Sequence, residues 1–173
     1  MRIVTTPMCE EIVKSAGASD YTVNKNPDLE EGDLDILLSE SKVKMKSLPV
    51  KLNTPVQIFN SIMEVSELLD NKLSENEILE FFKDYKMCVK YLENHNNQHV
   101  KVKVYSNFLK DIILNMGFKI SDEDYDYVIY PDYLKNKISN ENHNLIEIPT
   151  HTNVDKNPFK RIEIRYSILE KLI

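Results

Sequence analysis

The chain has 173 residues, a length typical of one domain that can bury a sizeable core. Hydrophobic residues make up 42% of it and charged residues 29%, which are ordinary values for a globular protein. The net charge is −6 and only Arg2, Arg161 and Arg165 are arginines, which argues against a dedicated nucleic-acid binder. We therefore expect a single domain over residues 1–173 with no nucleic-acid partner.

The sequence also carries expectations about the surroundings of the protein. No apolar run approaches the roughly 20 residues needed to span a bilayer, and no signal peptide precedes the first strand pattern. Cys9 and Cys88 are too few for a disulfide framework or a zinc site. We expect a cytoplasmic protein with no metal, no cofactor of its own and no membrane partner, in which Cys9 stays a free thiol. The sequence leaves a homodimer open.

Strand and helix patterns alternate along the first part of the chain, which is typical of an α/β sheet. Residues 9–16 predict the first helix, which Gly17 ends. Residues 43–52 are ambiguous, because their apolar residues favour extended structure and Pro49 limits any helix. The first strands are predicted at residues 3–5, 21–24 and 33–38.

Two longer helices are predicted in the middle of the chain. A polar cap followed by proline starts the first of them at Thr54. Ser74 with Glu77 three residues later is a capping-box pattern, and apolar residues then recur at helical spacing as far as Leu92. The polar stretch 93–98 that follows is the best candidate for a boundary within the chain.

The last part of the chain returns to the alternation of strands and helices, although no sequence repeat is strong enough to indicate a duplication. Ser106 caps a predicted helix at residues 107–116, and Asn157 caps a final helix that begins at Pro158. The strands here are predicted at residues 100–104, 127–130 and 145–148. Together the elements predict an α/β fold with a Rossmann-like open sheet, mostly parallel and flanked by helices.

The residues that follow predicted strands or open a helix are candidates for ligand contacts. In open parallel sheets, ligands bind beyond the carboxyl ends of the strands. Each candidate has a plainer alternative as a cap or turn residue, and His151 is more often a loop histidine bonded to a carbonyl than a proton carrier. The candidates are Thr6, Met8, Ser39, Glu40, Thr54, Thr150, His151, Thr152 and Asn153.

Cys9 is the candidate nucleophile. With Thr6 as the cap of the first helix, Cys9 falls in its first turn, where free N–H groups and the helix dipole favour the reactive thiolate. Against this, Glu10 and Glu11 add negative charge that opposes a thiolate. Cysteine is also among the most buried residue types, so a packing role is the alternative, and it is the expected role of Cys88.

Absent motifs narrow the chemistry. The sequence has three glycines and contains no Gly-x-Gly-x-x-Gly, no phosphate loop and no Gly-x-Ser-x-Gly elbow. A cysteine can still accept an acyl group, since its thiolate attacks an activated carboxyl group and keeps it as a thioester. The alternatives are a binding or scaffold protein without covalent chemistry, and a small hydrolase or transferase that uses Cys9 with His151 as base.

Three segments carry a resemblance to a known family. Arg-Ile-Val-Thr-Thr-Pro-Met-Cys-Glu-Glu-Ile at 2–12, Asn-Lys-Asn-Pro at 24–27 and Asp-Ile-Leu-Leu-Ser-Glu at 35–40 resemble the HcgF family. That family of methanogenic archaea serves biosynthesis of the iron-guanylylpyridinol (FeGP) cofactor of Fe-hydrogenase.

The resemblance implies a specific reaction. Cys9 would accept the carboxyl group of guanylylpyridinol after an HcgE-type partner has activated it with ATP as an adenylate. The resulting thioester would be the precursor of the acyl group that ligates iron. The resemblance thus implies guanylylpyridinol as ligand and an HcgE-type enzyme as partner. The alternative is a protein of the same pathway that binds a nucleotide-like ligand non-covalently or acts as a scaffold.

Overall fold

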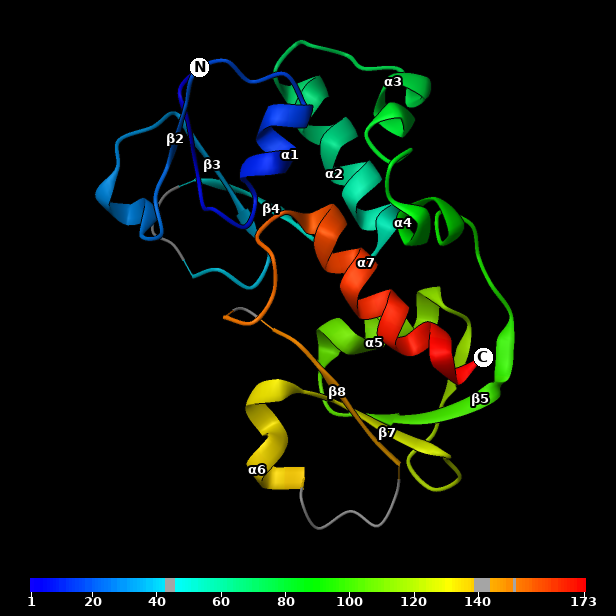
Figure 1. Ribbon diagram of the computed structural model, residues 1–173. Coiled ribbons are helices and arrows are strands. Elements are labelled where there is room, and N and C mark those ends of the chain that lie inside the picture. The colour runs from blue at the N-terminus through cyan, green and yellow to red at the C-terminus, as the bar shows by residue number, and fades with distance from the viewer. Residues whose placement is uncertain (43–45, 139–143, 151) are drawn as a thin grey trace.

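The strands form two parallel sheets flanked by helices, as Figure 1 shows. The computed structural model describes residues 1–42, 46–138, 144–150 and 152–173. Every strand pairing within the described residues is parallel. The predicted α/β class with mostly parallel strands is confirmed, and the strands are shared between two sheets. None of the described helices has the length and apolar composition needed to cross a bilayer.

The first sheet has the order β2-β1-β3-β4. Its strands are β1 (Ile3–Thr5), β2 (Tyr21–Val23), β3 (Leu34–Leu38) and β4 (Ser47–Val50). The short helix α1 (Glu10–Ser15) connects β1 to β2, and the 3-10 turn η1 (Pro27–Leu29) precedes β3. β1 and β3 are apolar runs because both lie inside the sheet and are buried on two faces. Of the ambiguous stretch 43–52, residues 47–50 form β4, and residues 43–45 lie outside the described part.

The second sheet has the order β6-β5-β7-β8. Its strands are β5 (Asn97–Val104), β6 (Phe118–Ile120), β7 (Tyr127–Pro131) and β8 (Asn144–Ile148). Helix α5 (Asn107–Asn115) connects β5 to β6, and η2 (Asp132–Leu134) with α6 (Lys135–Ile138) follows β7. β6 and α6 are absent from the sequence prediction, because three or four residues carry too little periodicity.

The two sheets repeat one topology. In each, the second strand in chain order lies at one edge, followed by the first, the third and the fourth. A helix follows the first strand and another follows the fourth in both halves. The structure therefore shows a repeat of strand order that the sequence alone did not indicate.

The helices between and after the sheets begin as their caps predict. In α2 (Pro55–Leu68) the Thr54 side chain accepts a hydrogen bond from Gln57 N at 3.2 Å. In α3 (Glu75–Glu80) Ser74 and Glu77 form the expected capping box. In α7 (Pro158–Leu169) the Asn157 side chain accepts from the first free backbone N–H groups. Each cap satisfies donors that have no partner within the helix.

The helix predicted from Ser74 to Leu92 is wrong in one respect, because the structure divides it. After α3 the chain turns, and α4 (Lys86–Lys90) starts anew. The carboxylate of Glu163 in α7 accepts hydrogen bonds from Met87 N at 2.6 Å and Cys88 N at 3.2 Å. A distant side chain thus supplies the cap of α4, which no local pattern could predict. η3 (Glu170–Leu172) closes the chain after α7.

The polar stretch 93–98 is also only partly a loop. β5 begins at Asn97, so its first residues lie within the predicted boundary. The side chain of Asn97 donates to Met116 O at 2.7 Å, and that of Gln98 donates to Gly117 O at 2.8 Å. These amides tie the start of the strand to the end of α5, which explains why polar residues occur in a strand here.

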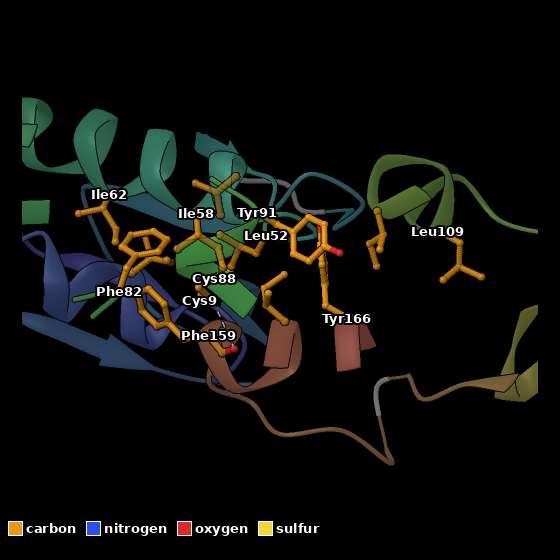
Figure 2. Close-up of a cluster of buried hydrophobic side chains, with 14 of the residues drawn as sticks. Cys9, Leu52, Ile58, Ile62, Phe82, Cys88, Tyr91, Leu109, Phe159 and Tyr166 are labelled. Atoms are coloured by element: carbon orange, nitrogen blue, oxygen red, sulfur yellow. Dashed lines mark hydrogen bonds between the residues drawn. The ribbon is translucent and has the colours of Figure 1, made fainter. Parts of the chain in front are cut away.

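One cluster of buried hydrophobic side chains extends through both halves. Its largest members include Phe82, Tyr91 and Tyr166, each less than 2% exposed. Figure 2 shows these rings with Phe159, and Phe82 meets Phe159 edge to face with centroids 5.0 Å apart. Tyr166 Oη donates to Asn115 Oδ1 at 2.6 Å, which satisfies the one polar group of this buried ring.

Asp35 is a polar exception in the first sheet. Leu34 and Ile36 beside it belong to the hydrophobic cluster, so Asp35 lies on the opposite face of β3. It is 1% exposed, and its Oδ2 has no hydrogen-bond partner among the described residues. Burial, with a smaller contribution from Asp28, raises the pKa of this carboxyl above its ordinary value of 3.8.

We predict that Asp35→Asn stabilises the protein at neutral pH by about 1 kcal/mol, because it removes a charge that the fold desolvates. A raised pKa in the folded state means that stability is lost as pH rises through the titration of this group. The gain should therefore shrink in acid, where Asp35 is protonated. Thermal unfolding of both proteins against pH measures it. Exposed Asp20→Asn is the control, and an unchanged or lower midpoint for Asp35→Asn at neutral pH contradicts the prediction.

Candidate functional site

A cleft of about 780 Å³ opens at the carboxyl ends of the strands of both sheets. Loops that follow β1, β3 and β4 form one wall, and loops that follow β5, β7 and β8 form the other, with α7 between them. The first wall includes Thr6, Met8, Glu40, Leu52 and Asn53. The second includes Ser106, Asn107, Phe108, Tyr133, Thr150 and Thr152. The repeated topology thus brings equivalent strand ends to one hollow.

The structure brings together five of the residues predicted from strand ends. The cleft is lined by Thr6, Met8, Glu40, Thr150 and Thr152.

Three other predicted residues lie elsewhere. Asn153 lines a smaller hollow of about 300 Å³ next to Thr150. Ser39 and Thr54 line neither hollow: Ser39 N donates to Val50 O, and Thr54 is buried as the cap of α2. His151 lies outside the described residues.

Cys9 does not line the cleft. It is the N-cap of α1 and not a residue of its first turn, because the chain from Thr6 first makes a separate turn in which Cys9 N donates to Thr6 O at 2.9 Å. The side chain is fully buried in the hydrophobic cluster (Figure 2). Burial raises the pKa of the Cys9 thiol to about 11, and the opposing effects of Thr6 and Arg161 are smaller. The thiolate expected at this helix start is therefore disfavoured.

At Cys9, the position at a helix start and the burial in the core have opposite effects on the pKa of the thiol. A helix start lowers the pKa of a thiol only if the thiol stays near water or a fixed charge. Here the helix is six residues long and the thiol is sealed within the hydrophobic cluster, so desolvation outweighs the favourable interactions. The residue next to it in the chain, Met8, lines the cleft instead.

The cleft is cationic although the chain is acidic. Lys25, Lys156, Arg161 and Arg165 line it, and Glu40 is the one carboxylate among its described lining residues. The chain as a whole carries a net charge of −6. Positive charge is therefore concentrated where the two sheets meet, which favours an anion in the cleft.

The two arginines are cleft residues that the prediction from strand ends did not include. Arg161 and Arg165 belong to α7 and not to a loop after a strand, and they are 2% and 6% exposed. Burial lowers the pKa of each guanidinium to about 10, so both remain charged at neutral pH. One signal was available in the sequence: two of its three arginines stand four residues apart in the predicted final helix, on one helix face.

Asp132 holds the loop that forms one rim of the cleft. Its carboxylate accepts hydrogen bonds from Thr150 N at 3.1 Å, from the Thr150 hydroxyl and from Asn153 Nδ2 at 2.8 Å. Burial pushes the pKa of Asp132 upward, but these hydrogen bonds together outweigh it and hold the pKa below its ordinary value. The charged carboxylate thus positions Thr150 at the cleft.

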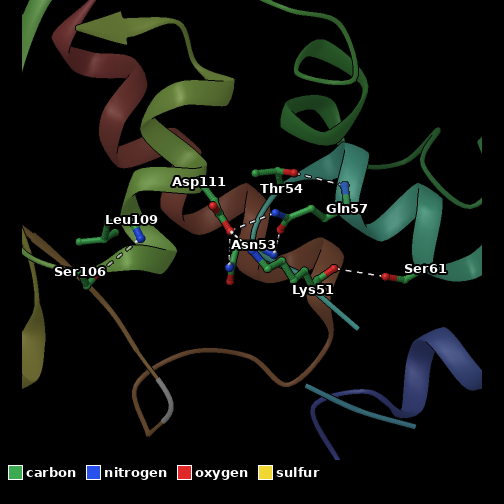
Figure 3. A network of polar contacts seen from close by, with 8 residues as sticks. All are labelled: Lys51, Asn53, Thr54, Gln57, Ser61, Ser106, Leu109 and Asp111. Carbon is green, nitrogen blue, oxygen red and sulfur yellow. Dashed lines mark hydrogen bonds and ion pairs between the residues drawn. The ribbon is translucent and has the colours of Figure 1, made fainter. Parts of the chain in front are cut away.

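A polar network centred on Asp111 joins the two walls. Figure 3 shows Asp111 of α5 facing Lys51, Asn53 and Gln57. Its Oδ2 accepts hydrogen bonds of 3.0 Å from both Asn53 Nδ2 and Gln57 Nε2, and Lys51 Nζ lies 3.8 Å away. Because Asn53 lines the cleft, this network fixes the wall after β4 against the helix after β5.

The described residues offer little to a bare metal ion. Among them, no group of three or more His, Cys, Asp and Glu side chains is arranged to hold one. Hydroxyl, amide and guanidinium groups dominate the polar part of the cleft wall instead.

Similar solved structures share the fold. A mutant of a periplasmic metal binding protein from Candidatus Liberibacter asiaticus, with manganese bound, matches with a TM-score of 0.62 and 8% identity over 100% of both chains. The SBP FpvC from P. aeruginosa in complex with Ni²⁺ matches with a TM-score of 0.57 and 9% identity, over 100% of this chain and 96% of that one. Zn(II)-bound AdcA from Streptococcus pneumoniae matches with a TM-score of 0.54 and 13% identity. The match covers 99% of this chain and spans 57% of AdcA.

The comparisons overturn the resemblance to the HcgF family. No protein-family model matches the chain, and no curated protein matches it either. The similar structures are metal-binding proteins, so the resemblance is wrong. Wrong with it are the reaction and the interactions that it implied: thioester formation in FeGP biosynthesis, guanylylpyridinol as ligand and an HcgE-type partner. Residues 2–12, which carried much of it, form a strand, a turn and a short helix, a unit common to parallel α/β folds.

We predict that Cys9 reacts slowly with iodoacetamide in the folded protein at neutral pH, because its thiol is buried and protonated. Cys88, also fully buried, should react as slowly, and both should react at the rate of a free thiol once the protein is unfolded. Mass spectrometry of the labelled peptides measures both rates in one sample. Rapid labelling of Cys9 before Cys88 in the folded protein contradicts the prediction.

We predict that Asp111→Ala lowers the free energy of unfolding by about 1–2 kcal/mol, because Asn53 and Gln57 lose a charged acceptor. Denaturant unfolding measures the change. Asp122→Ala, at an exposed position, is the control and should leave stability unchanged. Equal stability of Asp111→Ala and the unmodified protein would show that the network contributes nothing.

Proposed function

We propose that this chain is a ligand-binding protein that holds a small anionic molecule, non-covalently, in the cleft between its two sheets. The observation that carries the proposal is the charge of the cleft. Four cationic side chains and one described carboxylate line it, in a chain whose net charge is −6. Such a concentration of positive charge attracts and orients anions.

The position and size of the cleft support a binding role. Carboxyl ends of parallel strands are the usual ligand site in α/β folds. A volume of about 780 Å³ falls within the roughly 300–1,000 Å³ typical of small-molecule sites. Its wall combines apolar side chains such as Leu52 and Phe108 with a few polar groups, which is the usual composition of such sites. The proteins of similar structure are named for binding, which supports a binding role for this chain too.

A divalent metal ion, as named for those proteins, is the second candidate ligand. The comparison favours it, whereas the wall of the cleft does not, because Glu40 is the one described carboxylate that lines it. Metal ions in proteins are held by several carboxylate, imidazole or thiolate groups. The same binding experiment separates the two candidates.

We predict that organic anions raise the thermal unfolding midpoint of the protein and that divalent metal chlorides do not. Differential scanning fluorimetry against a panel of carboxylates, phosphate esters and metal salts measures this. Asn107→Trp places a bulky ring in the cleft at the start of α5 and should abolish the shift. Leu114→Trp on the same helix, at a position 64% exposed and outside the cleft, should keep it.

Three results would contradict the proposal. One is a shift caused by metal chlorides alone, which supports the second candidate. Another is the same anion shift in Asn107→Trp as in the unmodified protein, which places the ligand elsewhere. The third is no shift with any anion of the panel.

A further inference from the structure

The guanidinium groups of Arg161 and Arg165 lie on one face of α7. Residues four apart in a helix have Cβ atoms about 6 Å from each other. Both side chains are almost fully buried, and both line the cleft. Two positive charges are therefore held close together at the cleft between the two sheets.

Among the described residues, only some of the N–H donors of each guanidinium have an acceptor, and these acceptors are neutral. Arg161 uses one terminal nitrogen, Nη1, which donates to Lys156 O at 2.5 Å and lies 3.5 Å from Asp155 O and 3.7 Å from Met8 Sδ. Arg165 uses Nε, which donates to Pro149 O at 3.1 Å. A guanidinium carries five N–H donors, so most donors of both groups have no acceptor among the described residues.

The two side chains that carry the unused donors both line the cleft. Among the described residues, Asp35 Oδ2 is the one side-chain nitrogen or oxygen that is both sealed from solvent and unpaired. The free guanidinium nitrogens therefore keep access to solvent, and the cleft that both residues line supplies it. The Arg165 Cζ lies 4.9 Å from the centroid of the Phe108 ring, which is a favourable cation–π contact.

Two carboxylates near the arginines, those of Asp155 and Asp132, interact with other groups, and Glu40 is the one described carboxylate that lines the cleft. Asp155 pairs with Lys160 at 3.6 Å and also accepts from Asn157 N at 2.9 Å. Asp132 accepts the hydrogen bonds of Thr150 and Asn153 described above. No described carboxylate lies within 4.0 Å of either guanidinium, so neither buried charge is directly paired with a carboxylate among the described residues.

We infer that Arg161 and Arg165 form a two-arginine subsite for a dianionic group of the ligand, either a phosphate or two neighbouring carboxylates. The inference rests on the proposed function and names the chemistry that the cleft recognises. Each guanidinium offers a pair of N–H donors that matches two oxygens of an oxyanion. Two such pairs on one helix face suit a group with two negative charges better than a single carboxylate. Burial makes this pairing strong, because the charges are otherwise desolvated and only partly compensated by backbone carbonyls.

The test uses inorganic phosphate, malonate and acetate as probes in isothermal titration calorimetry. We expect the unmodified protein to bind phosphate or malonate and to bind acetate at least tenfold more weakly. Arg161→Met and Arg165→Met keep a long side chain without charge, and each should weaken binding of the dianion at least tenfold. Arg2→Met removes the remaining arginine, which is half exposed beside Glu30, and should leave binding unchanged.

Lysine variants provide a second test in case the methionine variants do not fold. Arg161→Lys and Arg165→Lys keep the positive charge but lose the two-nitrogen fork, so they should also weaken dianion binding at least tenfold. Circular dichroism checks the fold of each variant. A preference for phosphate over malonate, or the reverse, identifies the source of the dianion.

Some outcomes overturn the inference. These are no binding of phosphate or malonate, equal binding of acetate, or unchanged dianion binding in the methionine or lysine variants. Failure of the subsite is distinct from failure of the proposed function. If an anion stabilises the protein and Asn107→Trp abolishes this while the arginine variants do not, the cleft binds anions through other residues.

Discussion

The packing of α7 against both halves of the molecule is the constraint on which the rest of the structure depends. Figure 1 shows this helix lying between the two sheets. Phe159, Ile162 and Tyr166 place its apolar face in the common hydrophobic cluster. Glu163 caps α4, and Tyr166 bonds to the end of α5. A single helix therefore connects α4 to α5, and the same helix lines the cleft through Arg161 and Arg165.

The same packing determines the electrostatics of the site. A helix that enters the core with arginines at two positions buries their charges, which is costly unless anions or hydrogen bonds compensate. Backbone carbonyls of residues 149, 155 and 156 supply part of the compensation. The other N–H donors of both guanidinium groups remain available to a ligand in the cleft. An anionic ligand would complete it, so binding and the stability of this helix should be coupled.

The sequence predicted those features that depend on local residues. The caps at Thr54, Ser74 and Asn157 and the inner strands were found because a few neighbouring residues determine them. The break between α3 and α4 was not, because Glu163 acts on Met87 across 76 residues of chain. The division of the strands into two sheets also depends on pairings between distant segments. The five predicted residues that line the cleft follow from the rule for strand ends, and that rule does not include arginines on a helix.

The repeated strand order explains why a cleft forms, and individual side chains decide what it can bind. Two parallel sheets that face each other through their carboxyl ends create a hollow whatever residues line it. Ligand chemistry then depends on the few side chains that the loops and α7 supply. In this chain those side chains carry hydroxyl and amide groups and the guanidinium groups of two arginines, with one carboxylate among the described lining residues. An architecture shared with metal-binding proteins is therefore compatible with a site whose charge favours an anion.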